Sequence, residues 1–199
     1  MGESVQTRNT RDAILDATDR LLARFGYKKM TIDDLAHEVG IGKGSVYLHF
    51  SSKEEIALSH IDRIIERLKK NLANIASKPI PSEERLKLML VERVLFRFDS
   101  VQHYSQSLND LLAYVRPSLL ERRKLYFEEE AKIFARVLDE GLASGVFRPI
   151  NSIETARTIL IATNSLLPYS LSVEELGKRN DLRLKTLEIA CLVLDGVKA

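Results

Sequence analysis

Residues 31–53 read T-I-D-D-L-A-H-E-V-G-I-G-K-G-S-V-Y-L-H-F-S-S-K. The stretch from Thr31 to Asp34 has the pattern of a capping box, in which a Thr side chain accepts a backbone N–H and an acidic side chain three residues later returns the bond. The short helix that follows should end at Gly40, and a second short helix is expected over about residues 43–50. Two short helices joined by a tight glycine-containing turn are the layout of a helix-turn-helix.

The second of these helices has two faces of different character. Val46 and Phe50 are four residues apart and should face inward, where the small Ala36 allows close approach. The outward positions are then Lys43, Gly44, Ser45, Tyr47, Leu48 and His49. A helix that enters the roughly 12 Å wide major groove needs such a slim leading turn and outward donors. Lys53 would add a cation beside the N-terminal amides of the next helix, which suit a phosphate.

Helical periodicity continues through the chain, and no segment alternates convincingly as a strand would. On the first helix Ile14, Leu21, Leu22 and Phe25 form one apolar face, with Gly26 as a left-handed C-cap. The expected helices cover about 10–24, 31–39, 43–50, 53–77, 83–100, 105–115, 118–144, 152–170 and 181–198. We therefore predict an all-α fold with an N-terminal three-helix helix-turn-helix domain, residues 1–52, and a C-terminal helical bundle domain, residues 53–199, joined by helix 53–77.

Composition and charge narrow the class of protein. The 199 residues are 45% hydrophobic and 29% charged, as in an ordinary globular chain, and the polar N-terminus predicts a cytoplasmic protein without a signal peptide. The single cysteine, Cys191, excludes an internal disulfide framework. Residues 1–60 hold eight Lys or Arg and nine Asp or Glu, a difference of −1. DNA binding would therefore depend on a few well-placed donors and not on bulk charge.

Catalytic and metal sites are not expected. Ser59, His60 and Asp62 have the residue types of a catalytic triad, but near-adjacent positions on a helix point in different directions. The four histidines and Cys191 have no metal-ligand spacing, so Cys191 is expected in the core or at an interface. We predict no enzyme activity, no metal and no cofactor.

Residues 9–60 resemble the N-terminal domain of the tetracycline-repressor (TetR) family of bacterial regulators. The matching features are the segments Phe25-Gly26-Tyr27, Thr31 to Ala36, Val39-Gly40-Ile41, Lys43 to Phe50 and Ser52 to Glu55. The resemblance covers about a quarter of the chain. It implies that the third helix lies in the major groove, that a dimer binds a palindromic DNA operator, and that a small-molecule effector in the C-terminal domain releases the DNA.

The resemblance also assigns roles by position. Phosphate-facing residues would be Thr31, Tyr47, His49 and Lys53, and those nearest the bases would be Lys43, Gly44, Ser45 and Leu48. Some alternatives stay open: Tyr47 and His49 can instead pack on a neighbouring helix, and Leu48 is either a contact to a thymine methyl or a stray exposed apolar group. The chain departs from the family at Gly42, where a polar cap is common. Asp33 suits the helix dipole but would repel a phosphate.

The C-terminal domain offers candidate ligand-pocket residues because polar or amphipathic side chains there interrupt apolar helices. They are Phe98, His103, Tyr104, Tyr114, Arg116, Tyr126, Phe134, Thr163 and Asn164. Among them Arg116 could attract an anionic ligand. The alternative is that each of the nine is an ordinary core or surface residue.

The last two helices, 152–170 and 181–198, carry more apolar residues than one layer needs, which predicts a homodimer through a four-helix bundle. These residues are Ile153, Ala156, Ile159, Leu160, Thr163, Leu166, Leu167, Leu184, Leu187, Ile189, Ala190, Leu192, Val193 and Leu194. The alternative is that they close the core of a single chain. We expect a ligand-responsive transcriptional regulator, with repression as its default effect. The rival function is a small-molecule-binding or interaction protein of the same fold that does not bind DNA specifically.

Overall fold

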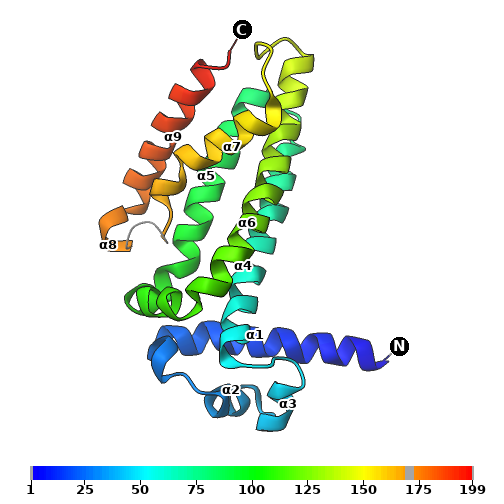
Figure 1. Ribbon diagram of the computed structural model, residues 1–199, viewed down its shortest axis with the longest axis vertical. Coiled ribbons are helices and arrows are strands. Elements are labelled where there is room, and N and C mark those ends of the chain that lie inside the picture. Colours follow the sequence, from blue (N-terminus) through cyan, green and yellow to red (C-terminus); the bar gives the residue numbers. More distant parts are fainter. Residues whose placement is uncertain (1, 169–172, 199) are drawn as a thin grey trace. The chain divides into compact units, whose positions relative to one another are not determined.

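The computed structural model describes the backbone of residues 2–168 and 173–198, and the side chains of residues 9–103, 108–168 and 175–198. In these residues the fold is all-α, as predicted, and no strand forms beyond an isolated bridge between Phe147 and Lys198 (Figure 1). No described helix is both long and apolar enough to cross a membrane. The elements in chain order are α1 (Gly2–Lys29), α2 (Ile32–Val39), α3 (Lys43–Tyr47), α4 (Lys53–Ala76), α5 (Ser82–Val101), η1 (Gln102–Tyr104), α6 (Ser105–Ala143), α7 (Ser152–Ala162), η2 (Asn164–Leu166), α8 (Val173–Leu176) and α9 (Arg179–Asp195).

The chain divides into two compact units. The first holds the residues up to Arg63 together with His103–Leu120, and the second holds Ile64–Gln102 together with the residues from Glu121 onward. The boundaries of these units differ from residue 52, because the first turns of α4 and the part of α6 up to Leu120 belong to the first unit. The division at residue 52 into a DNA-binding and a ligand-binding domain stays a prediction about function.

In the first unit, the apolar face that was predicted for α1 is buried, with one exception. Ile14, Leu21 and Leu22 are buried, but Phe25 is 42% exposed, so its predicted burial is wrong. Gly26 has a positive φ of 71° as expected, but its ψ of 169° turns the chain away from the left-handed helical conformation. The chain beyond this kink brings Tyr27 into the core in place of Phe25, and the Arg24 guanidinium lies 4.9 Å from the centre of the Phe25 ring.

The second unit has a core of two apolar clusters. The larger is built from the end of α4 with α5, α6, α7 and α9, and includes Leu90, Phe134 and Leu160. The smaller gathers Val94, Leu95, Phe98, Leu166, Leu167, Leu176 and Leu182. Most apolar residues of 118–144 are buried, among them Ala131, Phe134 and Leu138, whereas Leu120 and Leu125 are exposed.

Several predicted helix boundaries are wrong. The predicted break at Pro117 does not occur, because α6 runs through it, held by the buried Val115 and Leu119 on either side. A proline removes one backbone hydrogen bond from a helix, and packing here outweighs that loss. The helix predicted over 152–170 ends at Ala162, where Thr163 is the C-cap and η2 follows. Similarly, α3 ends at Tyr47 and not near residue 50.

Candidate functional site

The N-terminus of α2 is fixed by the predicted capping box. The Thr31 hydroxyl accepts the Asp34 N–H at 3.1 Å, and the Asp34 carboxylate accepts the Thr31 N–H at 2.8 Å and the Thr31 O–H at 2.7 Å. These hydrogen bonds from Thr31 lower the pKa of Asp34. Thr31 itself is exposed, so its side chain orients the start of α2 at the surface where phosphate contact is predicted.

The turn between α2 and α3 follows the sequence pattern. Gly40 is the C-cap of α2 in the left-handed conformation, with φ 75° and ψ 34°, and its N–H points to the carbonyls of Ala36 and His37. The Ile41 N–H also donates to the Ala36 carbonyl, at 2.9 Å. Because a left-handed C-cap favours glycine, the sequence fixes where α2 stops and therefore how α3 is presented.

The inner and outer sides of α3 and of the residues that follow it, up to Phe50, differ as predicted. Val46 and Phe50 are buried at 0% and 3% exposure, and the Arg11 guanidinium lies 4.9 Å from the centre of the Phe50 ring. On the other face Leu48 is 84% and Tyr47 50% exposed. An added Cβ at Gly44 would have no neighbouring heavy atom within 4 Å.

All eight candidate DNA-contacting residues lie in the first unit, on the N-terminal ends of α2 and α4 and on α3 with the residues after it. Thr31, Lys43, Gly44, Tyr47 and Leu48 are exposed, whereas Ser45, His49 and Lys53 are half-buried. The structure therefore brings the predicted donors to one region, around an exposed helix whose inner side is anchored. Their contact with DNA stays a prediction.

Lys43 is paired with an acidic neighbour. Its Nζ lies 2.8 Å from Asp33 Oδ2, and both side chains are more than half exposed. The hydrogen bond and the charge of Asp33 raise the pKa of Lys43. Asp33 was expected to repel a phosphate. In the structure its carboxylate forms an ion pair with Lys43, the first residue of α3.

Lys53 has structural partners that the sequence did not reveal. Its Nζ donates to the carbonyls of Met30, at 2.9 Å, and Lys28, at 3.4 Å, and lies 4.4 Å from the centre of the Tyr27 ring. Partial burial lowers the pKa of Lys53. Lys53 thus ties the start of α4 to the segment that joins α1 and α2, and its predicted phosphate contact is untested.

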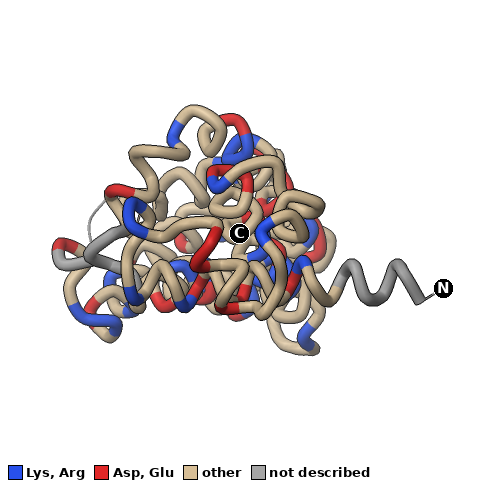
Figure 2. Tube along the Cα trace, turned by 90° about the horizontal axis from the view of Figure 1, so that it is seen from below, with Lys and Arg blue, Asp and Glu red and all other residues tan. Residues whose placement is uncertain are grey.

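The charges of the described residues are of mixed sign. Figure 2 shows Lys and Arg interspersed with Asp and Glu along the chain. Within the first unit, Arg20 pairs with Glu38, and Lys28 pairs with Asp110. The predicted DNA recognition would therefore depend on individual donors around α3 more than on a broad electrostatic field.

Replacing Asp33 with asparagine is expected to strengthen DNA binding. The substitution keeps the size of the side chain, removes a negative charge next to α3 and frees the Lys43 ammonium for a phosphate. One additional phosphate contact would steepen the dependence of log K on log salt by about 0.9 per bound head. The measurement is fluorescence anisotropy of a labelled duplex over a salt series.

The matched control for this variant is Asp110→Asn. It releases Lys28 from a similar exposed pair with a Nζ–Oδ1 distance of 2.7 Å in the same unit, but on α1 and α6. Equal affinity and equal salt slope for Asp33→Asn and the unsubstituted protein would contradict a role for Lys43 at the DNA.

The nine ligand-pocket candidates separate into two groups. Five lie inside or at the edge of the second unit's core, and these are Phe98, Tyr126, Phe134, Thr163 and Asn164. Three lie exposed in the first unit, and these are His103, Tyr114 and Arg116. The side chain of Tyr104 lies outside the described residues. These three exposed side chains do not line an interior. Tyr114 and Arg116 lie on α6, which continues past Pro117, and His103 lies in η1.

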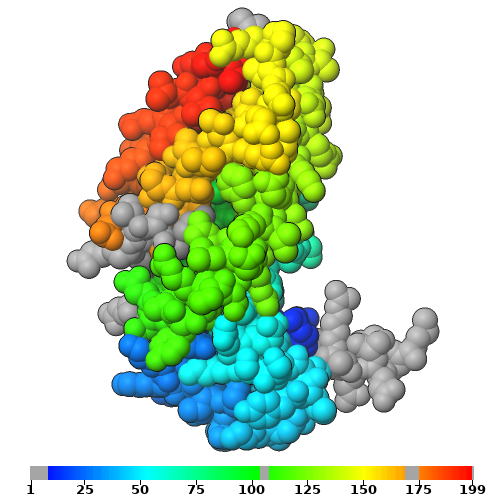
Figure 3. Space-filling view, viewed as in Figure 1, coloured from blue at the N-terminus to red at the C-terminus, as the bar shows by residue number. Residues whose placement is uncertain are grey.

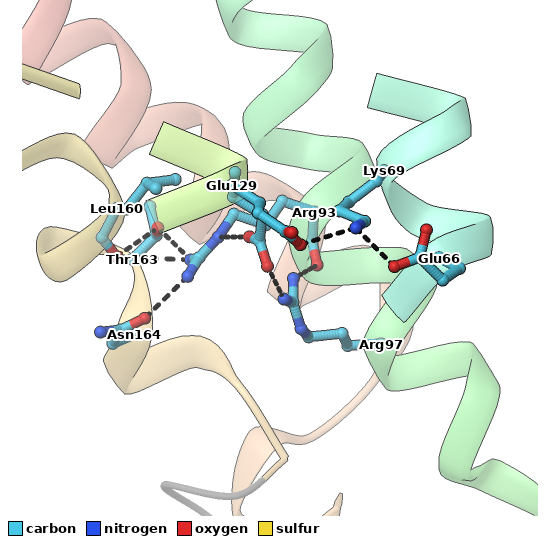
Figure 4. A network of polar contacts seen from close by, with 9 residues as sticks. Glu66, Lys69, Arg93, Arg97, Glu129, Leu160, Thr163 and Asn164 are labelled. Atoms are coloured by element: carbon cyan, nitrogen blue, oxygen red, sulfur yellow. Dashed lines mark hydrogen bonds and ion pairs between the residues drawn. The ribbon is translucent and has the colours of Figure 1, made fainter. Parts of the chain in front are cut away.

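A buried ionic network in the second unit was missed by the sequence analysis (Figure 4). The Arg93 Nε–H donates to Glu130 at 2.9 Å, its Nη1 to the Thr163 hydroxyl at 2.7 Å, and its Nη2 to the Asn164 side-chain oxygen at 2.8 Å. Arg97 also donates to Glu130, through Nη2. Two of the predicted pocket residues, Thr163 and Asn164, are thus partners of an arginine.

The sequence contains a pattern from which this buried network could have been predicted. Arg93 and Arg97 continue the apolar stripe that begins with Leu86 and Leu90 on α5, and Glu130 precedes Ala131 on the stripe of α6. Charged residues at positions where the helical period demands apolar ones indicate a buried ion pair. Burial raises the pKa of Glu130, but the charges and hydrogen bonds of Arg97 and Arg93 outweigh it, and the net effect is to lower the pKa.

The last two helices do not leave as much spare apolar surface as predicted. Ala156, Ile159, Leu160, Ala190 and Leu194 are buried in the core of their own unit. That part of the argument for a dimer is wrong, because α7 and α9 pack against α5 and α6 and use those residues there.

A smaller apolar surface remains on α7 and α9. Leu192 is 77% exposed, Ile161 61% and Leu184 48%, and Cys191 is exposed as well. Figure 3 shows atoms of both helices on the same face of the second unit. We call Ile161, Leu184, Cys191 and Leu192 the α7/α9 surface. The expectation that Cys191 lies in the core is wrong, whereas its place at an interface stays a prediction.

Comparison with known proteins gives one clear family. Residues 14–59 match the sequence model of the bacterial regulatory proteins of the tetR family. The HTH-type transcriptional repressor KstR2 of Mycolicibacterium smegmatis is 30% identical over 148 residues, which cover 72% of this chain and 70% of that protein. Residues 14–59, which match the family model, include the whole of α2 and α3.

Two further similarities reach into the second unit. The fatty acid metabolism regulator protein of Bacillus subtilis is 27% identical over 158 residues, or 75% of this chain and 77% of that protein. The crystal structure of a transcriptional regulator from Cytophaga hutchinsonii superposes with a TM-score of 0.78 at 22% identity, covering 94% of this chain and 98% of that one. This last likeness supports the fold.

Proposed function

Because the chain belongs to the tetR family of bacterial regulatory proteins, which are DNA-binding transcriptional regulators and not enzymes, we propose that it is a ligand-responsive repressor. In this proposal a dimer binds a palindromic operator, and a small-molecule effector in the second unit releases it. The repressor activity is proposed by similarity, since the related KstR2 is named a transcriptional repressor. The first unit reads DNA, and the second senses the effector and forms the dimer.

The observation that carries the DNA-binding half is the contrast between the two faces of α3. Val46 and Phe50 hold the inner face in the core, so the exposed Tyr47 and Leu48 are presented on a rigid support. Open space around Gly44 lets the leading turn approach a base pair closely. In this arrangement Lys43, Gly44, Ser45 and Leu48 face the bases, and Thr31, Tyr47, His49 and Lys53 face the phosphates.

The operator follows from the symmetry of a dimer. Two identical heads related by a two-fold axis read two inverted half-sites. The half-sites must lie about 10–10.5 base pairs apart, centre to centre, or near a multiple of that distance, to meet major grooves on one side of the duplex. An effector that binds the DNA-free form more tightly shifts the population away from the bound state.

Selection from a random library of duplexes with the full-length protein tests this proposal. We expect enriched sequences with two inverted half-sites. Tyr47→Phe removes one hydroxyl donor to a phosphate and should weaken binding of the enriched duplex roughly 10-fold, about 1.4 kcal/mol. Anisotropy titration at constant salt measures the loss.

Tyr114→Phe is the matched control, because Tyr114 is also a half-exposed tyrosine of the first unit but lies on α6. It should bind the duplex as the unsubstituted protein does. Failure to enrich any sequence, with the protein folded, would contradict DNA recognition and favour a small-molecule-binding or interaction protein of the same fold.

A further inference from the structure

The interior of the second unit carries two guanidinium groups that share one carboxylate. Arg93 is 1%, Arg97 7% and Glu130 1% exposed. Glu130 pairs with both arginines, through Oε2 with Arg93 and through Oε1 with Arg97. Buried charges are stable when they are paired and hydrogen-bonded. Each guanidinium is therefore paired with one oxygen of the Glu130 carboxylate.

The two arginines are held very differently. Arg93 donates to Glu130, to the Thr163 hydroxyl, to the Asn164 side chain and to the Leu160 carbonyl at 3.3 Å. It links α5 to α6 and to the end of α7. These bonds fix its guanidinium and identify Arg93 as the anchor of the network.

Arg97 is held less completely. It donates to Glu130 through Nη2 and to the Arg93 backbone carbonyl through Nη1, at 3.2 Å. Its Nε is buried and has no hydrogen-bond partner among the described residues. A buried donor without a partner is costly, and natural proteins keep few of them. The Arg97 Nε–H is thus a preformed donor, with a positive charge behind it, that lacks an acceptor.

Apart from Arg93 and Glu130, the residues near Arg97 along α5 are apolar. On α5 it follows Val94 and Leu95 and precedes Phe98, and these three residues belong to the smaller cluster of the second unit. On α6 the buried Tyr126 lies one turn before Glu130. An acceptor that reaches Arg97 therefore belongs to a molecule whose remaining part is largely apolar.

We infer that Arg97, held beside Glu130, binds the carboxylate of an amphipathic effector. This inference rests on the proposed function, because it names the chemical class of the molecule that the second unit senses. A carboxylate matches the planar donor geometry of a guanidinium. A carboxylate would also place a negative charge beside the Arg97 guanidinium, which shares Glu130 with Arg93.

The network also gives the effector a route to its response. Arg97 and Arg93 share Glu130, so a carboxylate at Arg97 competes with Glu130 for the same guanidinium. Arg93 in turn holds Leu160, Thr163 and Asn164 at the end of α7, the helix that carries part of the α7/α9 surface. Binding therefore alters the contacts between α5, α6 and α7.

Thermal unfolding of the full-length protein with defined acids tests the inference. The probes are hexanoate, dodecanoate and cholate, each compared with its neutral primary amide. At least one acid should raise the unfolding midpoint by about 2–4 °C or more, and its amide should not. If none of the three acids shifts the midpoint more than its amide, the inference is overturned.

Arg97→Met separates an effector site from a structural ion pair. The variant keeps an apolar stem of similar length and leaves Arg93 and Glu130 as a balanced pair, so the ligand-free midpoint should stay unchanged or rise. The stabilisation by the acid should disappear. A large fall of the ligand-free midpoint, or an unchanged response to the acid, would mean that Arg97 is structural.

Two further variants complete the test. Arg97→Lys keeps the charge but not the fork of donors, and should respond to the acid less than the unsubstituted protein. Arg157→Met is the control, because Arg157 is a half-buried arginine of α7 paired with Glu128 at 2.7 Å, and it should respond in full. An equal loss of response in Arg157→Met would overturn the assignment to Arg97.

The test of the carboxylate site does not depend on whether the protein binds DNA. A protein that enriches a palindromic duplex but ignores all three acids disproves only the carboxylate site. A protein that binds an acid through Arg97 but enriches no duplex retains the site and disproves the proposed repressor function.

Discussion

Replacing Glu130 with glutamine is expected to lower the free energy of unfolding by about 3–5 kcal/mol, because removal of one partner leaves buried charges uncompensated. Glutamine keeps the shape of the side chain but not its charge, so Arg93 and Arg97 would both lose the carboxylate that they share in an interior where Glu130 is 1% exposed. A guanidinium cannot escape this cost by losing its proton at any ordinary pH. Urea denaturation followed by circular dichroism measures the change.

Glu129→Gln is the control for this variant. Glu129 directly precedes Glu130 on α6, but its side chain is half exposed and pairs with Lys69 at 2.6 Å. An exposed pair contributes roughly 0–1 kcal/mol, so the same substitution one residue earlier should have little effect. Similar losses for the two variants would mean that burial of the network does not decide its contribution.

The effect of Glu130→Gln should also depend on pH. The two arginines lower the pKa of Glu130 in the folded protein. A carboxylate with a lowered pKa stabilises the folded state above its unfolded pKa, about 4.3. This stabilisation is lost as the pH falls through the folded value. The difference in unfolding free energy between the two proteins should therefore be full near neutral pH and shrink in acid.

Replacing Leu192 with glutamate should dissociate the proposed dimer. Leu192 is the most exposed apolar residue described on α9. In a two-fold interface it would come near the same surface of a second copy, so the substitution removes an apolar contact and introduces a charge on both sides. We expect the dissociation constant to rise about 100-fold or more, which corresponds to about 2.7 kcal/mol.

Light scattering after size-exclusion chromatography, over a range of concentrations, measures this change. Leu125→Glu is the matched control, since Leu125 on α6 is 66% exposed but lies outside the α7/α9 surface. Its solution mass should equal that of the unsubstituted protein. A dimer that survives Leu192→Glu but not Leu125→Glu would move the interface to α6.

Features of the fold that depend on a few neighbouring residues could be predicted from the sequence. The capping box of Thr31 and Asp34, the left-handed Gly40 and the inward side of α3 each follow from interactions within one or two helical turns. This is why the helix-turn-helix was predicted correctly while much of the second unit was not.

Features that depend on packing between distant segments could not be predicted in this way. Pro117 normally ends a helix, yet α6 continues because Val115 and Leu119 are buried around it. Arg93 and Arg97 are buried, although a charged side chain is rarely buried without a partner. Their partner, Glu130, lies more than thirty residues away in the sequence.

The outer side of α3 has a consequence for how such a protein diversifies. An added Cβ at Gly44 meets no atom within 4 Å, and Leu48 is 84% exposed. Side chains at these two positions can therefore be exchanged with little effect on folding. Val46 and Phe50, which maintain the fold, are buried on the opposite side. Under the proposed function, a library randomised at 44 and 48 samples new operator preferences at nearly constant stability, and gene duplicates diverge in target by the same route.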